Sequence, residues 1–227
     1  MILALPETDS GINRVRLQVE RVDYAAPEAS GRQGGVQAGW PLWSARFEMD
    51  RIDPVSADQW CAFVDRLRGR INRFYSYDPT RTFPLAYPSG FAAFAGFAGA
   101  AASWSQAIQA DGSAELTLTG LPVGLALGLG DYVGFKWDAS GAAAGSYERR
   151  TMARNVGGAA VASSAGEMTV TIEPPVNTAL VPASSIAHLD RPQCVMQQVP
   201  EETELGPTVE AGIMSGATIV GIQDLRP

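Results

Sequence analysis

The residues that could carry acid–base or nucleophilic chemistry are few, and they are scattered along the 227-residue chain. His188 is the single histidine, and a Ser–His–Asp triad would need it as its general base. No Gly-x-Ser-x-Gly elbow occurs in the sequence, and neither Cys61 nor Cys194 has a recognisable histidine partner. We therefore interpret His188 as a structural residue and predict that the chain is not an enzyme.

Other common reactive sites are disfavoured as well. The two cysteines lie far apart, which predicts reduced thiols and neither a metal site nor a disulfide framework. Asp131, Asp138 and Glu148 are candidates for a glycosidase pair, but such a pair needs a separation of about 5–9.5 Å that sequence spacing does not set. The glycine-rich stretches at 31–35 and 124–130 lack the Gly-Lys-Ser/Thr ending of a phosphate loop. We predict no catalytic residue, no metal and no cofactor.

Five aromatic residues between positions 104 and 147 raise the question of sugar stacking: Trp104, Tyr132, Phe135, Trp137 and Tyr147. In a small β module, exposed rings can stack on sugar rings. The alternation over residues 132–137 places Val133, Phe135 and Trp137 on one face, which indicates core packing for most of these rings. Carbohydrate recognition is kept as the alternative to a structural role.

A strand–helix–strand unit over residues 43–79 is the clearest pattern in the chain. Four apolar residues alternate with polar ones and predict a half-buried strand: Trp43, Ala45, Phe47 and Met49. Ser56 and Gln59 fit a capping box that opens a helix over residues 57–68. The helix has one apolar stripe at i, i+3, i+4 and i+7: Trp60, Phe63, Val64 and Leu67. Gly69 is placed to end it, and a second strand is expected at residues 71–77.

The rest of the chain is predicted to be β-structure with many turns. A half-buried strand covers residues 13–22, and residues 25–39 then form a long hairpin-like excursion or a mobile loop, which is often a contact element. Further strands are expected around Leu116 and at 132–137, 147–154 and 168–173, with Asp111-Gly112 as a turn. Residues 186–198 and 217–225 are expected to be strands that return to the first domain, the one that contains the strand–helix–strand unit.

Composition limits the classes of function. The net charge is −7 and the pI is near 4.8, which disfavours nucleic-acid binding through a basic surface. No apolar run of about 18 residues occurs, so we expect no membrane span. The Ala/Gly-rich residues 91–104 are interpreted as a loop-plus-strand linker. Residues 1–6 lack the charged and apolar regions of a signal peptide, so we expect no secretion.

Two groups of like charge are candidates for contacts between subunits. The first is a cluster of arginines: Arg66, Arg68, Arg70 and Arg73. The second is a cluster of glutamates near the carboxyl end: Glu201, Glu202, Glu204 and Glu210. They are either solvated faces or complementary patches. The excursion adds the candidate interface residues Ser30, Gly31, Arg32 and Gln33.

Two blocks of the chain carry a family resemblance. The first consists of Trp43-x-Ala45, Trp60-x-x-Phe63-x-x-x-Leu67-Arg68-Gly69-Arg70, Phe74 and Asp78-Pro79. The second consists of Leu121-Pro122, Gly130-Asp131-Tyr132 and Val170-Thr171-Ile172-Glu173-Pro174-Pro175. Together they resemble the distal tail protein of long-tailed (siphophage-type) bacteriophages over most of residues 12–192. These motifs are structural rather than catalytic.

The resemblance implies a mostly β fold with one flanking helix. A tail-tube-like β-sandwich would comprise residues 1–97 plus 185–227, and a small β-barrel or sandwich would be inserted at 98–184. The implied function is a ring, expected to be a hexamer, that connects the tail tube to the baseplate hub and continues the DNA lumen. The implied partners are further copies of the chain, the tail tube protein and the baseplate hub protein, with tail fibres as a further candidate.

The implied location is the virion tail, after assembly in the host bacterial cytoplasm. The alternative is a carbohydrate-recognising baseplate or receptor-binding protein of the same particle. A third class, a hydrolase of the cell wall, lacks a catalytic set in this sequence.

Overall fold

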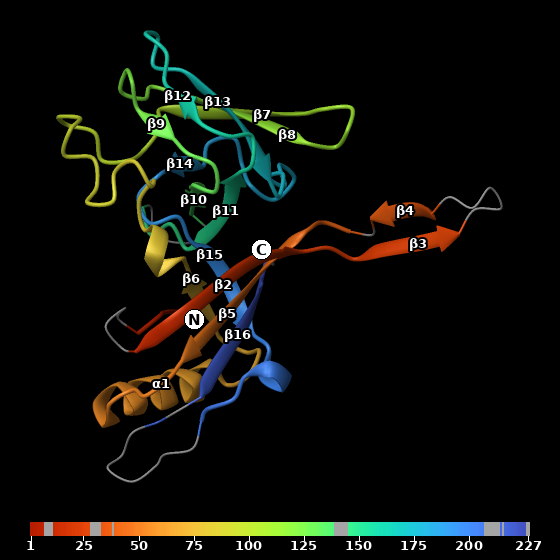
Figure 1. The fold of residues 1–227 in the computed structure, drawn as a ribbon, viewed down its shortest axis with the longest axis vertical. Helices are drawn as coiled ribbons and strands as arrows, with labels where there is room; N and C mark the ends of the chain where they lie inside the picture. Colours follow the sequence, from red (N-terminus) through yellow and green to blue (C-terminus); the bar gives the residue numbers. More distant parts are fainter. Residues whose placement is uncertain are drawn as a thin grey trace.

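The computed structural model describes residues 1–6, 11–27, 33–37, 39–138, 145–206, 214 and 216–225. In that part of the chain the protein is mostly β with one α-helix, which confirms the predicted fold class. Most strands belong to two six-stranded sheets. Figure 1 shows the first sheet with the helix at one end of the molecule and the second sheet at the other.

The first sheet combines strands from both ends of the chain. Its order is β1-β6-β15-β16-β5-β2. The strands are β1 (Ile2–Ala4), β2 (Ile12–Glu20), β5 (Leu42–Met49), β6 (Arg73–Ser76), β15 (Cys194–Gln198) and β16 (Ala217–Gln223). Strand β1 runs parallel to β6, whereas the other neighbours are antiparallel. The short 3-10 helices η1 (Pro79–Arg81) and η2 (Pro200–Glu202) follow β6 and β15.

Helix α1 (Pro54–Leu67) begins earlier than the sequence indicated. Its N-cap is Asp53, whose Oδ1 accepts hydrogen bonds from the backbone N–H groups of Val55 (3.0 Å) and Ser56 (3.1 Å). The predicted capping box at Ser56 is therefore wrong, and the Ser56 hydroxyl instead donates to Asp53 Oδ2 at 2.6 Å. Asp53 prevails because Pro54 at the first helical position needs no hydrogen-bond acceptor and has a preset φ.

The predicted apolar stripe of α1 is confirmed as the centre of the first core. Trp60 and Leu67 are fully buried, Phe63 is 6% exposed, and Val64 is partly buried. The stripe packs with the predicted strand face of β5: Trp43, Ala45, Phe47 and Met49. Phe63 makes edge-to-face contacts with Trp60 and with Phe74 of β6, each at 5.7 Å between ring centroids. These contacts favour one orientation of the rings, in addition to the burial of their apolar area.

The second sheet has the order β14-β10-β11-β13-β8-β7. Its strands are β7 (Ser103–Ile108), β8 (Ala114–Thr119), β10 (Tyr132–Trp137), β11 (Arg149–Asn155), β13 (Met168–Glu173) and β14 (Ile186–His188), and β9 (Ala126–Leu127) pairs with β12 (Ala160–Val161) beside it. The predicted Asp111-Gly112 turn lies in the β7–β8 hairpin, where Gly112 has a φ of 85°.

One strand prediction fails at the boundary between the sheets. Residues 186–198 were expected to return to the first domain as one segment, but β14 pairs with β10 and only β15 joins the first sheet. Gly134 explains the close approach, because a Cβ there would lie 2.6 Å from His188 Nε2. A glycine in β10 thus leaves room for the imidazole of β14.

The segment between β6 and β7 is held by aromatic contacts. Phe91 is buried and contacts Phe83 at 5.7 Å and Phe97 at 5.0 Å between ring centroids, and Tyr87 contacts Phe94 at 5.4 Å. These rings join the second core, so the Ala/Gly-rich linker is packed onto the sheet. None of the helices in the described ranges is long and apolar enough to cross a membrane.

We predict that Phe63→Ala destabilises the protein by about 3–5 kcal/mol, because it removes a buried ring and leaves a cavity between α1 and β6. Urea unfolding followed by far-UV circular dichroism measures the change. Val55→Ala is the matched control on the same helix, since Val55 is 67% exposed, and it should change the free energy of unfolding by less than about 0.5 kcal/mol. Equal effects of the two substitutions would contradict the packing of α1.

Candidate functional site

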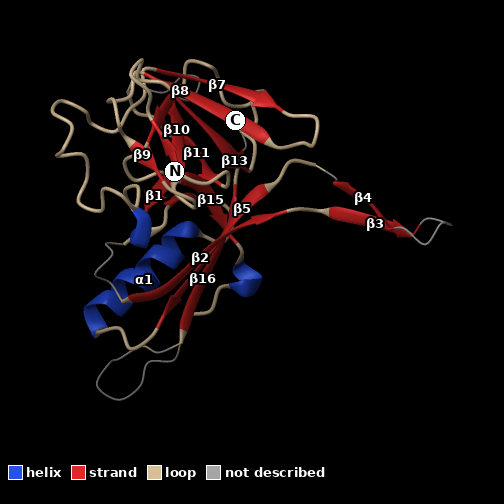
Figure 2. Cartoon of the chain, turned by 45° about the horizontal axis from the view of Figure 1, so that its top comes forward, coloured by secondary structure: helices blue, strands red, loops and turns tan. Residues whose placement is uncertain are grey.

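A hairpin arm stands away from the body of the molecule. We use "the arm" for strands β3 (Asp23–Pro27) and β4 (Gln33–Gln37), which pair in register from Asp23 opposite Gln37 to Pro27 opposite Gln33. Figures 1 and 2 both show it extending beyond the two sheets. The predicted excursion is therefore a hairpin in its described part.

The arm has no third strand among the described residues, because β3 and β4 form a two-stranded sheet of their own. An isolated two-stranded hairpin is marginally stable in water. At its base, Val22 and Tyr24 are 59% and 65% exposed. Of the candidate interface residues in the excursion, Gln33 begins β4, whereas Ser30, Gly31 and Arg32 lie outside the described residues. The arm is the clearest candidate for a contact with another molecule.

The arginine and glutamate clusters meet within one chain. Arg70 Nη2 lies 2.9 Å from Glu201 Oε2, and both side chains are more than half exposed. Arg73 points elsewhere, toward Asp224 at 3.9 Å. Arg66 and Arg68 are exposed, and within the described ranges neither has an ion-pair partner.

The glutamate cluster is exposed in its described part. Glu201 and Glu202 belong to η2, and Glu204 follows it, with a backbone bridge to Thr218 of β16. All three side chains are exposed. Glu210 lies outside the described residues. The cluster thus lies where β15 ends and β16 begins, close to Arg70 after α1, rather than on the arm.

His188 is placed as a packing residue. Its side chain is 4% exposed, and its Nδ1 contacts the Asp190 backbone oxygen at 2.9 Å and the Asp190 carboxylate at 3.3 Å. Its Nε2 faces the backbone of Gly134, which excludes a substrate from that side. Cys61 and Cys194 are free thiols. No group of three metal-ligating side chains occurs among the residues that the structure describes.

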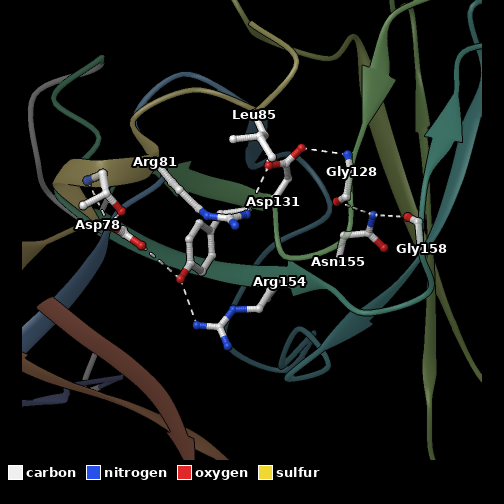
Figure 3. A network of polar contacts seen from close by, with 10 residues as sticks. Asp78, Arg81, Leu85, Gly128, Asp131, Arg154, Asn155 and Gly158 are labelled. Atoms are coloured by element: carbon white, nitrogen blue, oxygen red, sulfur yellow. Dashed lines mark hydrogen bonds and ion pairs between the residues drawn. The ribbon is translucent and has the colours of Figure 1, made fainter. Parts of the chain in front are cut away.

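The three carboxylates considered for acid–base chemistry differ in setting. Asp131 is 1% exposed and accepts hydrogen bonds from the N–H groups of Leu85 (3.0 Å) and Gly128 (2.7 Å), with Arg81 at 3.5 Å (Figure 3). It holds two loops against the second sheet.

Asp138 accepts from the N–H groups of Gly145 (2.9 Å) and Tyr147 (2.6 Å), and these bonds lower its carboxyl pKa. Glu148 contributes a backbone oxygen to Tyr75 at 3.4 Å. Asp131 and Asp138 thus act as acceptors that shape the backbone.

The aromatic rings weighed as a sugar platform are mostly part of the core. Trp104, Tyr132 and Phe135 are buried, whereas Trp137 and Tyr147 are half-buried. Trp104 packs edge-to-face on Phe135 at 4.8 Å between centroids. The predicted core role of most of these rings is confirmed.

A polar junction joins the two sheets, and no motif or local periodicity predicts it. The Trp43 indole N–H donates to the Met152 backbone oxygen at 2.6 Å. The Arg154 guanidinium lies 5.0 Å from the Trp43 ring and donates to the Leu17 backbone oxygen at 2.8 Å. Arg154 also donates to the Tyr132 hydroxyl at 2.8 Å, which contacts Asp78 at 3.5 Å (Figure 3). Burial raises the pKa of Tyr132, so its hydroxyl stays protonated in this network.

Three further contacts extend the junction toward the arm. Gln223 of β16 accepts from the Trp43 backbone N–H at 3.0 Å and donates to Thr151 of β11 at 2.7 Å. Arg21, just before the arm, forms an ion pair with Glu173 of β13 at 2.6 Å. The arm is therefore anchored to both sheets at its base.

Comparison with known proteins does not assign the chain to a family. No family model matches it, and no curated protein matches it significantly.

We predict that the free energy of unfolding falls between about pH 8.5 and 10, by up to about 1.4 kcal/mol per pH unit from Cys194. Burial raises the pKa of the Cys194 thiol, so the folded thiol stays protonated while the unfolded thiol ionises. The stabilisation is complete below the unfolded pKa and is lost as the pH rises.

Urea unfolding across this pH range measures the slope, and Cys194→Ala should flatten it. Cys61→Ala is the matched control and should keep the wild-type slope. An unchanged slope in Cys194→Ala would show that the thiol does not contribute.

Proposed function

We propose that this chain is a structural subunit of a phage tail tip, and that copies of it form a ring between the tail tube and the baseplate hub. The ring would continue the DNA lumen, and a hexamer is the expected order. The sequence resemblance supplies the family, and the observation that carries the proposal is the unsupported arm.

The free-energy cost of ordering the arm favours a role for it in assembly. Ordering backbone costs about 1–2 kcal/mol per residue, and among the described residues β3 and β4 pair only with each other. A neighbouring subunit or the adjoining ring can supply the missing contacts. Because the arm leaves the body on one side (Figure 2), it can bind a neighbour head-to-tail, and head-to-tail contacts close into rings at the right rotation.

The junction between the sheets supports the same role. A ring closes only if every subunit holds its two contact surfaces at a fixed angle. Trp43, Arg154 and Gln223 join the sheets through hydrogen bonds within 3.0 Å. Such a network gives the rigidity that a closed ring needs.

Charge is compatible with a lumen that passes DNA. The net charge of −7 argues against a surface that retains DNA by counterion release. The exposed arginines Arg66 and Arg68 then belong to a protein contact rather than to the lumen. Salt would screen the electrostatic attraction between these arginines and an acidic surface of a neighbouring subunit.

We predict that deleting Ser30–Gln37 leaves a folded monomer that no longer forms rings or joins tails. The deletion removes β4 and so removes the paired arm, while both sheets keep their strands. Sedimentation velocity measures the assembly, and circular dichroism verifies the fold.

A control variant with glycine–serine residues in place of 139–144 alters a different segment, one that contains none of the candidate interface residues, and should still assemble. Normal ring formation by the deletion variant would show that the arm is not an interface element.

A further inference from the structure

A cavity of about 520 Å³ lies where the base of the arm meets the second sheet. Its walls come from three places: Arg21 and Trp40 on either side of the arm, the β7–β8 turn at Ile108–Ser113, and the end of β13 at Glu173–Pro175. Its volume falls within the roughly 300–1,000 Å³ of small-molecule sites. Neither the ring proposal nor the sequence patterns assign it a role.

Trp40 is an exposed ring held in a fixed position. Its indole Nε1 donates to the Pro175 backbone oxygen at 3.2 Å, yet the residue is 42% exposed. Since the polar atom of the indole is already bonded to the protein, the accessible part of the side chain is apolar ring surface. Ile108, 56% exposed, adds a second apolar wall from the β7–β8 turn. The cavity thus contains a preformed stacking platform.

Hydrogen-bond acceptors surround this platform. Glu173 is paired with Arg21 at 2.6 Å. Asp111 accepts from the Ser113 N–H at 2.9 Å and from its hydroxyl at 2.7 Å, and the Ser113 hydroxyl lowers the pKa of this carboxyl. An ionised carboxylate has about four lone-pair sites, so both groups can accept further bonds. Among the donors of the lining, Ser113 is bonded to Asp111 through its N–H and its hydroxyl, and Arg21 directs Nη2 to Glu173.

We propose that this cavity binds a neutral pyranose sugar. One face of a pyranose carries C–H groups that can stack on the Trp40 ring, and its rim carries hydroxyl donors that match Glu173 and Asp111. The lining holds two carboxylates and one arginine, and this net negative charge disfavours the binding of uronic acids and phosphates. A peptide backbone brings acceptors as well as donors and would leave its carbonyl groups unpaired beside these carboxylates.

The proposal does not depend on the ring. Deleting Ser30–Gln37 leaves every lining residue of the cavity in the chain, and Trp40→Ala leaves the arm strands unchanged. Loss of ring formation and loss of sugar binding are therefore separate results. A sugar site on a ring-forming protein would place glycan contact at the base of the arm.

The test is a titration of the full chain with four methyl glycosides: those of glucose, galactose, N-acetylglucosamine and rhamnose. Intrinsic tryptophan fluorescence and saturation-transfer NMR report binding, since Trp40 is more exposed than Trp43, Trp60 and Trp104. At least one glycoside should bind saturably, with a Kd of about 1 mM. Trp40→Ala should weaken that binding at least tenfold, and Glu173→Gln should weaken it several-fold.

Two further variants keep the result interpretable. Trp40→Phe retains a ring and should bind within a few-fold of wild type even if Trp40→Ala fails to fold. Trp137→Phe changes a half-buried tryptophan of β10, outside the cavity lining, and should bind like wild type. No saturable response to any glycoside up to about 50 mM, well above the expected Kd, overturns the proposal. Binding that survives in folded Trp40→Ala, or Trp40-dependent binding of a lysine-rich peptide alone, overturns it as well.

Discussion

The contact of Trp43 with β10 and β11 is the interaction on which the rest of the structure depends. Trp43 is fully buried in the core of the first sheet, and its indole N–H is satisfied by Met152 of the second sheet. Arg154 lies between the Trp43 and Tyr132 rings, 5.0 Å and 5.1 Å from their centroids. Because unpaired buried polar groups are costly, the two sheets cannot separate without exposing or orphaning these groups. The molecule therefore behaves as one body with two cores.

This constraint determines where the arm and the cavity lie. Strand β2 leads into the arm and β5 follows it, and both pair with each other along most of their length. The Arg21–Glu173 ion pair and the Trp40–Pro175 hydrogen bond then tie the base of the arm to the end of β13. An arm of two strands thus emerges from a rigid base, and the cavity forms between that base and the β7–β8 turn. Assembly and ligand recognition would share one anchored region.

Local patterns predicted the parts of the fold that depend on burial alone. The alternation at Trp43–Met49 and the stripe from Trp60 to Leu67 report which face is apolar, and that face is the core. The helix start was misplaced because Asp53-Pro54 competes with Ser56 for the cap. Other features depend on contacts between segments that are distant in the sequence, and no local hydrophobic periodicity predicts them. These features are the sheet to which β14 belongs, the role of Arg154 and the exposure of Trp40. Tryptophans at 40 and 43 look alike in sequence, yet one is open to solvent and the other is buried.

The central claim, that the chain is a ring subunit, is tested most directly by the mass of the wild-type protein. Native mass spectrometry or cryo-electron microscopy class averages of the purified chain, and of particles that contain it, report the number of copies. A closed ring of several 24.0 kDa subunits, with six as the expected number, is the predicted result. A 24.0 kDa monomer both in isolation and inside the particle would contradict the account.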